Sequence, residues 1–292
     1  MLSMEEMKMK KTKKTFALLL AVAMCFGLMA GCGSTSSTSA STSPSASPAV
    51  SAAATAKTFT VGFDASFPPY GYKDDSGNYI GFDLDLAAEV CTINGWKLVL
   101  KPIDWDSKDL ELNSGSIDCI WSGFTINGRE DKYTWTEPYV KNSQVIVVKN
   151  DSGIKDLAGL KGKTVLVQAD SSALAALTDE TNAKNLALSA SFKALNQVPD
   201  YLTAFMSLDS GAGDAIAMDI GVAEYMIKQR GGNYTVLSEA ITDSEQYGVG
   251  FKLGNTELRD EVQKALDAMA KDGTVSKIAD KWGLKDSVLL GK

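Results

Sequence analysis

Short β-rich runs alternate with helical periods from Lys57 to the end of the chain. The runs TFTVGFD, KLVLKPI, NSQVIVVK, KTVLVQA and DAIAMD are rich in residues that strands favour. The closing helical segment carries a core stripe, Leu258, Val262, Leu266 and Met269. Strands that alternate with helices predict an α/β fold with mostly parallel sheets. The 236 residues of 57–292 fit two lobes of about 100 residues better than one sheet.

Residues 1–31 are predicted to be a signal peptide. The basic segment KMKKTKK precedes the apolar run TFALLLAVAMCFGLMAG, which ends in small residues before Cys32. This run is near the lower length limit for a membrane span and ends at a processing site, as signal peptides do. Because two glutamates precede the basic segment, the start of translation stays open between Met1 and Met7.

The sequence LMAGC, which ends at Cys32, resembles the lipobox at which bacterial lipoproteins are cleaved and lipid-modified. Its last three residues fit, whereas Met29 stands where leucine is usual. Residues 33–56 are uncharged and rich in Ser, Thr, Ala and Pro, so they cannot bury enough apolar surface to fold. Residues 32–56 are therefore predicted to be a lipid-anchored linker at the outer face of the cell membrane. The alternative is ordinary secretion with an unmodified Cys32.

The composition excludes several classes of function. Without residues 1–31 the chain keeps 24 basic and 34 acidic residues, a net charge of −10. Nucleic-acid binding needs a basic face, so no nucleic-acid partner is expected. The chain has no histidine, which excludes His-based catalytic triads and His metal sites. It also has no glycine-rich phosphate loop. No cofactor and no metal ion are predicted.

Two of the four cysteines, Cys91 and Cys119, belong to the predicted folded part. Each lies in an apolar stretch, so a small buried residue is the first interpretation. A disulfide between them is the alternative in an exported protein.

Polar groups of side chains or backbone follow several of the predicted strands. The positions are Asp64, Gly123, Thr125, Ser171, Ser172 and Asp219. Ligands of open parallel sheets bind beyond the carboxyl ends of the strands, and the two serines open a helix whose free N–H groups favour an anion. The segment SGFTINGRED adds Arg129 next to Thr125. A ligand with a carboxylate is therefore a candidate, and a surface turn with a solvated Arg129 is the alternative.

Asp83 and Asp85 lie in the first turn of the predicted helix DLDLAAEVCTING, which Gly95 ends. Paired carboxylates can be catalytic, but this position favours a structural role. We expect Asp83 to cap the helix and Asp85 to interact with its positive end.

These motifs together resemble the substrate-binding proteins that supply polar amino acids to bacterial ABC importers, family 3. GFDLDLAAEVC (81–91) matches the family signature before a helix. The likeness continues through FDASFPPYGY, SGSIDCIWSGFTINGRED, LKGKTVLVQADSSA, DAIAMD and YGVGFKLGNTELRDEV, and covers residues 57–285. The resemblance implies a two-lobed clamshell of the periplasmic-binding-protein type, with two strand-like crossings near 139–146 and 243–248.

The resemblance also implies the domain boundaries. Lobe 1 is expected to contain residues 57–142 and 248–292, and lobe 2 residues 143–247.

Roles for individual residues follow from the same resemblance. Arg129 is implied to bind the α-carboxylate of the ligand, with hydrogen bonds from Thr125, the backbone of Gly123 and Ser172. Asp219 is implied to bind the α-ammonium group. Family members commonly have five positions from the threonine to the arginine, whereas TINGR has four. The role of Arg129 therefore depends on a tighter turn.

The ligand's side chain is implied to pack against Phe67 and Trp105, while Asp64 and Gln168 set the polarity around it. Alternatives remain: the two aromatic residues as pure core, and Asp219 as a helix cap. Three further aromatic residues are predicted to serve packing alone: Tyr70, Tyr72 and Trp121.

The physics of a zwitterion agrees with these roles. A buried amino acid needs one fixed cation and one fixed anion, since each unpaired buried charge costs several kcal/mol. Arginine offers two parallel donors matched to a carboxylate. With Arg129 on one lobe and Asp219 on the other, only the closed form satisfies both ligand charges.

The sequence therefore predicts a monomeric, lipid-anchored extracytoplasmic receptor, not an enzyme. It would bind an L-amino acid with a polar side chain and deliver it to the permease of an ABC importer. One alternative is a dehydratase-like enzyme for small cyclic acids on the same fold, with Asp64 as a possible acid or base. Another is a ligand-sensing module without transport.

Overall fold

The computed structural model describes residues 56–291, without the side chain of Asp243. The predicted signal peptide, Cys32 and residues 33–55 of the linker lie outside the described residues. Within 56–291, no helix combines the length and apolar character needed to cross a membrane.

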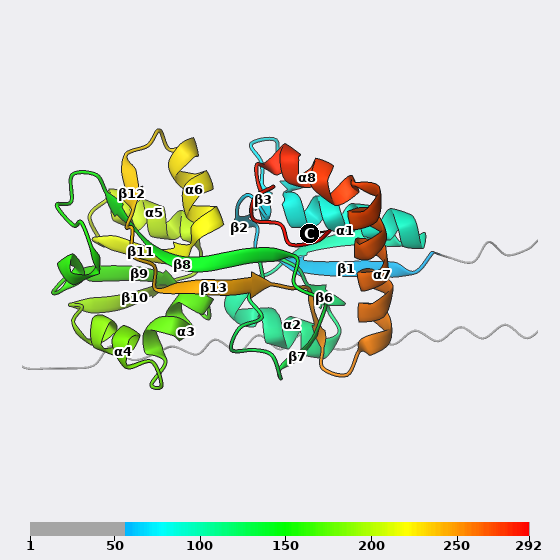
Figure 1. The fold of residues 1–292 in the computed structure, drawn as a ribbon, viewed down its shortest axis with the longest axis horizontal. Helices are drawn as coiled ribbons and strands as arrows, with labels where there is room; N and C mark the ends of the chain where they lie inside the picture. The colour runs from blue at the N-terminus through cyan, green and yellow to red at the C-terminus, as the bar shows by residue number, and fades with distance from the viewer. Residues whose placement is uncertain (1–55, 292) are drawn as a thin grey trace, which may run out of the picture. The chain divides into compact units, whose positions relative to one another are not determined.

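A five-stranded sheet in the order β5–β1–β6–β14–β7 organises the first lobe (Figure 1). Its strands are β1 Thr58–Phe63, β5 Lys97–Pro102, β6 Cys119–Ile120, β7 Tyr133–Trp135 and β14 Gly250–Lys252. The helices of this lobe are α1 Phe82–Asn94, η1 Trp105–Ser107, α2 Lys108–Ser114, α7 Thr256–Asp272 and α8 Thr274–Trp282. A small antiparallel sheet adds β2 Ser66–Phe67, β3 Gly71–Lys73 and β4 Tyr79–Ile80.

A second sheet, in the order β10–β9–β11–β8–β12 with β13 also paired to β8, organises the second lobe. Its strands are β8 Val140–Lys149, β9 Thr164–Gln168, β10 Ala194–Val198, β11 Ala215–Asp219, β12 Tyr234–Val236 and β13 Thr242–Tyr247. Its helices are η2 Leu157–Leu160, α3 Ser172–Thr178, α4 Ala183–Ala190, α5 Tyr201–Asp209 and α6 Ile220–Gln229.

The strands β8 and β13 run side by side from one sheet to the other (Figure 1). They pair antiparallel, with Val140 opposite Tyr247 and Asn142 opposite Glu245. The two crossings expected near 139–146 and 243–248 therefore correspond to β8 and β13.

The α/β fold is confirmed, but both large sheets are mixed rather than mostly parallel. In the first, β1 pairs in parallel with β5 and β6, while β14 is antiparallel to β6 and β7. In the second, β9 is parallel to β10 and β11, while β8 is antiparallel to its three partners. The parallel strands belong to the strand–helix alternation visible in the sequence, and the antiparallel ones are the crossings and the strands beside them.

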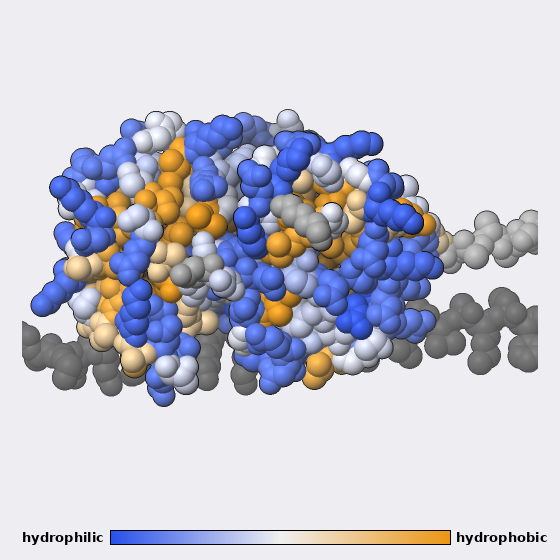
Figure 2. Space-filling model, viewed as in Figure 1, coloured by the Kyte–Doolittle hydropathy of each residue, from blue (hydrophilic) through white to orange (hydrophobic). Residues whose placement is uncertain are grey.

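The predicted stripe of the closing helical segment is confirmed, but the segment forms two helices. Leu258, Val262, Leu266 and Met269 are all buried on α7. Gly273, with φ 85°, ends α7, and α8 begins at the next residue. Hydrophilic side chains cover most of the face over α7 in Figure 2, as expected for the outer side of such a stripe.

Candidate ligand-binding site

A small cavity lies where the two lobes meet. It is lined by Phe67, Trp105, Gly123, Thr125, Arg129, Gln168, Ser171, Ser172 and Asp219. Eight of the nine predicted site residues are in this lining, and the ninth, Asp64, contacts Gln168 directly. The cavity volume is only about 10 Å³, roughly the room that one water molecule needs. The side chains around it therefore meet across the gap between the lobes.

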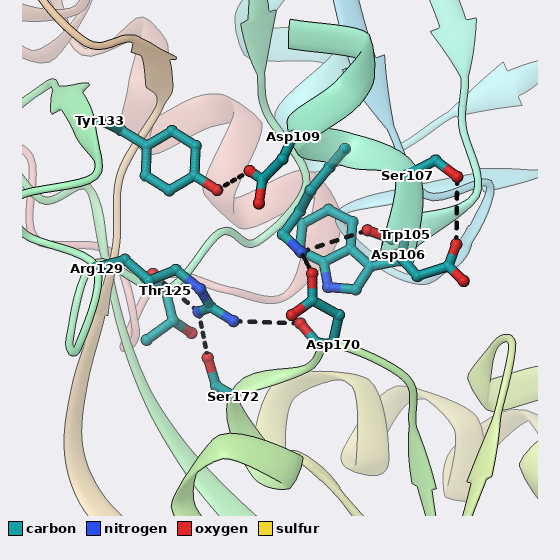
Figure 3. Close-up of polar contacts among 10 residues, drawn as sticks. Trp105, Asp106, Ser107, Asp109, Thr125, Arg129, Tyr133, Asp170 and Ser172 are labelled. Carbon is teal, nitrogen blue, oxygen red and sulfur yellow. Dashed lines mark hydrogen bonds and ion pairs between the residues drawn. The ribbon is translucent and has the colours of Figure 1, made fainter. Parts of the chain in front are cut away.

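Arg129 reaches from the first lobe to the second (Figure 3). Its buried guanidinium donates to the hydroxyl of Ser172 at 2.7 Å and to the carbonyl of Asp170 at 3.2 Å. It also donates to the carbonyl of Thr125 at 3.2 Å and lies 5.3 Å from the ring centroid of Phe124. A planar guanidinium in this setting presents parallel donors suited to a carboxylate.

The short TINGR segment is a tight turn that returns Arg129 to the cavity. The N–H of Arg129 donates to the carbonyl of Ile126 at 2.8 Å, and Gly128 has φ 77°, which favours glycine. The missing position relative to the family pattern therefore does not remove this guanidinium from the site.

Asp219, at the end of β11, is a buried carboxylate surrounded by uncharged donors. It accepts hydrogen bonds from Asn142 at 2.7 Å, Gln144 at 2.8 Å, Tyr247 at 2.8 Å and Tyr201 at 3.1 Å. Burial raises its pKa, although the four donors oppose the shift. Asp219 stands at the N-cap position of α6, but its side chain makes no capping hydrogen bond. Its carboxylate instead lines the cavity.

Both serines at the start of α3 have a defined partner. The hydroxyl of Ser171 accepts from the N–H of Leu174 at 3.2 Å and caps the helix. The hydroxyl of Ser172 accepts from Arg129. The second serine is thus the one that meets the opposite lobe.

Asp83 is not the helix cap that the sequence predicted. Gly81 occupies the N-cap position of α1, and the fully buried carboxylate of Asp83 accepts from the N–H of Gly123 at 2.7 Å and the hydroxyl of Tyr139 at 2.8 Å. Burial raises the pKa of Asp83 to about 7. Asp83 instead fixes the cavity loop at Gly123, so only the carbonyl of this glycine stays available to a ligand.

Gly123 also has a steric reason to be glycine. Its φ is 54°, and a Cβ there would come within 2.5 Å of the Phe67 ring and 3.0 Å of the Tyr247 ring. Even the smallest side chain would push an aromatic wall of the cavity away.

The aromatic and polar residues predicted around the ligand's side chain lie together. Phe67 packs against the Tyr201 ring at 5.8 Å, and Trp105 packs edge-on against Phe124 at 5.4 Å. Both also line the cavity, so they belong to the core and to the site. Across the gap, Gln168 donates to Asp64 at 2.7 Å. Burial raises the pKa of Asp64 to about 6.

A second buried carboxylate lies beside Asp219: Glu245 on β13, which was not predicted from the sequence. The amides of Asn142 and Gln144 donate to Glu245 at 3.0 and 2.8 Å and to Asp219 as well. Thr125 also donates to Glu245, at 3.4 Å. A signal existed, because the segment VKNSQ places two amides at alternate, inward positions of a strand whose inward face is otherwise apolar.

The three aromatic residues predicted to serve packing lie outside the cavity lining, as do the two cysteines of the folded part. Tyr70 and Trp121 are buried in the core, while the hydroxyl of Tyr72 bonds that of Tyr225 at 2.9 Å. Cys91 and Cys119 are buried free thiols, which agrees with their first interpretation as small core residues.

The chain matches the model of the bacterial extracellular solute-binding proteins, family 3, over residues 59–285. It belongs to this family. It is therefore an extracytoplasmic solute-binding protein of an ABC transporter and not an enzyme, so the dehydratase alternative is set aside.

Individual relatives cover nearly all of the chain. The L-cystine-binding protein TcyA of Bacillus subtilis is 28% identical over 272 residues, 92% of this chain and 97% of TcyA. The arginine-binding extracellular protein ArtP of the same organism is 30% identical over 274 residues, 92% and 98% of the two chains. A substrate-binding protein of an ABC uptake transporter from Streptococcus pneumoniae, solved with bound histidine, superposes with a TM-score of 0.74 at 33% identity, covering 79% of this chain and 94% of that one.

Proposed function

We propose that this protein binds an L-amino acid between its two lobes and delivers it to the permease of an ABC importer. The observation that carries the proposal is the pair Arg129 and Asp219, which bring opposite charges from opposite lobes to one cavity. A zwitterion needs one fixed partner for each of its charges when it leaves water.

The carboxylate end of the ligand would lie against Arg129. Ser172 accepts from this guanidinium at 2.7 Å, so its hydroxyl is within reach of the same ligand oxygen and can turn to donate to it. The hydroxyl of Thr125 lines the same cavity. The ammonium end would lie against Asp219, with the carbonyl of Gly123 as a second acceptor.

The ligand's side chain would extend between Phe67 and Trp105 toward Asp64 and Gln168. A buried carboxylate and an amide favour a polar or cationic side chain over an aliphatic one. Relatives of this chain are named for cystine and arginine, and one is solved with histidine, so ligands of this kind are the ones to test first.

Entry of such a ligand requires the lobes to separate, because the cavity holds about 10 Å³. The lobes that move would be residues 57–142 with 248–292, and residues 143–247, about β8 and β13 as hinges. Reclosure around the zwitterion would then bring the two charged side chains to it from opposite sides.

Attachment to the membrane is the second part of the proposal. The protein would be a monomer anchored by lipid at Cys32, with residues 33–56 as tether. A Cys32→Ser chain should then be released into the medium, whereas the parent stays with the membrane fraction. Equal membrane retention of both chains would remove the anchor from the proposal.

A thermal-shift screen tests the ligand. The full chain in detergent micelles is heated with each of the twenty amino acids, L-cystine and L-ornithine. A ligand at 100 times its Kd stabilises the folded form by about 2.7 kcal/mol. The shift should disappear in Arg129→Ala and persist in Arg230→Ala, whose ion pair with Asp209 lies at the surface. No shift with any of these compounds would refute amino-acid binding.

A further inference from the structure

Lys108 is a buried cation that the roles proposed so far do not use. It is the first residue of α2 and only 1% exposed. Its ammonium group lies 5.1 Å from the ring centroid of Trp105, donates to the carbonyl of Trp105 at 3.4 Å and forms an ion pair with Asp170. A lysine is seldom fully buried, and the first turn of a helix disfavours a positive charge. Its position therefore depends on the one carboxylate with which it pairs.

Asp170 reaches this lysine from the other lobe. It lies in the turn between β9 and α3, and within residues 56–291 it is the one non-glycine residue with positive φ, at 54°. Such a conformation costs an aspartate free energy that a glycine would not lose. Asp170 lies between Arg129 and Trp105 in Figure 3, and its carbonyl accepts from Arg129. One strained residue thus meets two buried cations of the opposite lobe, Arg129 and Lys108.

We propose that the Lys108–Asp170 ion pair is an interlobe clasp that forms when the lobes close and slows the release of the ligand. The proposal rests on the ligand-driven closure proposed above. Lys108 belongs to α2 of the first lobe and Asp170 to the β9–α3 turn of the second, so opening separates the two charges. Because Asp170 also holds Arg129 through its carbonyl, the clasp positions the guanidinium that faces the ligand's carboxylate.

The two partners differ in burial, and this gives the clasp a distinctive signature. The side chain of Lys108 is 1% exposed, whereas that of Asp170 is 51% exposed. Loss of the aspartate charge leaves a buried, unpaired ammonium group in the closed form, which is costly. Loss of the lysine charge leaves an aspartate that water can solvate. Asp170→Asn should therefore impair closure more than Lys108→Met, and the double variant should recover most of the difference.

The first experiment measures Kd and the dissociation rate for L-arginine, L-histidine and L-cystine with the full chain. Asp170→Asn, which tolerates positive φ, should weaken binding about tenfold, mainly through faster dissociation. Lys108→Met and the double variant should weaken binding by only about threefold, again through faster dissociation, because they lose the ion pair without leaving a buried charge unpaired. Lys101→Met, which removes an ion pair with Glu111 inside the first lobe, is the matched control and should bind like the parent. An unchanged Asp170→Asn, or a double variant as weak as this single one, would overturn the clasp.

A second measurement does not depend on a ligand. Spin labels at exposed positions of the two lobes, Met206→Cys and Leu253→Cys, report the distance between the lobes in ligand-free protein that also carries Cys25→Ser and Cys32→Ser. The population at the shorter distance should fall most in Asp170→Asn and recover in large part, but not fully, in the double variant. Identical distributions in all variants would contradict the clasp. If the parent binds none of the three amino acids, the proposed function fails. The distance distributions then still test whether the ion pair favours the closed form.

Discussion

The two ends of the cavity differ in the charges that they contain. At the end proposed for the ligand's carboxylate, here called the carboxylate end, Arg129 and Lys108 both reach across to the second lobe, where Lys108 forms an ion pair with Asp170. At the end proposed for the ligand's ammonium group, here called the ammonium end, Asp219 and Glu245 are two buried carboxylates that share the same uncharged amide donors. One end already contains an ion pair between the lobes, whereas the other end concentrates negative charge.

This difference indicates at which end of the cavity the charge of a bound ligand stabilises the protein more. Hydrogen bonds from neutral groups compensate a buried carboxylate only in part, and the pKa values of Asp219 and Glu245 are both raised by burial. The ligand's ammonium group would supply the missing positive charge. The carboxylate end can form contacts between the lobes without the ligand, so we expect it to control the rate of opening rather than the bulk of the affinity.

The largest effect is expected from Asp219→Asn. The variant should lose amino-acid binding by about 100-fold or more, because Asp219 lines the cavity and Glu245 does not, so the ammonium group would be buried without a carboxylate in contact. It should also melt at a higher temperature than the parent at pH 7 without ligand, because a buried anion has been removed. Calorimetric titration and thermal unfolding measure the two changes.

Arg129→Lys is the control at the other end. It keeps the charge but loses the planar donors, so it should weaken binding without stabilising the ligand-free protein. If Asp219→Asn lowers the melting temperature, the ammonium end is not a site of uncompensated charge and the comparison fails.

An intermediate effect is expected from the pH dependence of Asp64. Its pKa is raised to about 6 by burial, so the carboxylate is ionised at pH 7.5 and largely protonated at pH 5. The affinity for L-arginine should fall about tenfold over this range, because an ionised carboxylate stabilises a cationic side chain and a protonated one does not. Titrations at both pH values measure this change.

Asp64→Asn should remove that dependence. L-Glutamine, with an uncharged side chain, is the matched ligand for the parent protein and should show a much smaller change. A parallel loss of affinity for both ligands would assign the pH dependence to another group, such as Asp219.

The sequence allowed the fold and the charged residues of the cavity to be predicted because their signals are local. Strand and helix periods are read within a dozen residues, and Asp219 follows directly from its place at the end of an apolar strand. Arg129 was predicted from the motif SGFTINGRED. The tight turn at Gly128 explains why its guanidinium reaches the cavity although the segment is one residue shorter than the family pattern.

The contacts between distant segments could not be predicted in the same way. Lys108 lies in SKDLELN, where charges at helical spacing look like a solvated face, and its partner Asp170 is 62 residues away. The wrong assignment of Asp83 has the same cause, because its acceptor role depends on Gly123, 40 residues away. Such pairings need the tertiary fold, which places different elements side by side.

The smallest effect is expected from Glu245→Gln, and it tests the ammonium end by itself. Burial, followed by the charge of Asp219, raises the pKa of Glu245, so the folded protein binds this proton more tightly than the unfolded chain does. Stability from this group is fully present below about pH 4.5 and is lost as the pH rises through the folded pKa. Glu245→Gln should therefore melt like the parent near pH 4 and at a higher temperature at pH 7.5.

Binding by Glu245→Gln should change by only about threefold, because Asp219 remains to meet the ammonium group. Melting curves of the two proteins that stay parallel between pH 4 and 7.5 would show that the two carboxylates do not share an uncompensated charge, and the contrast between the two ends would then rest on Asp219 alone.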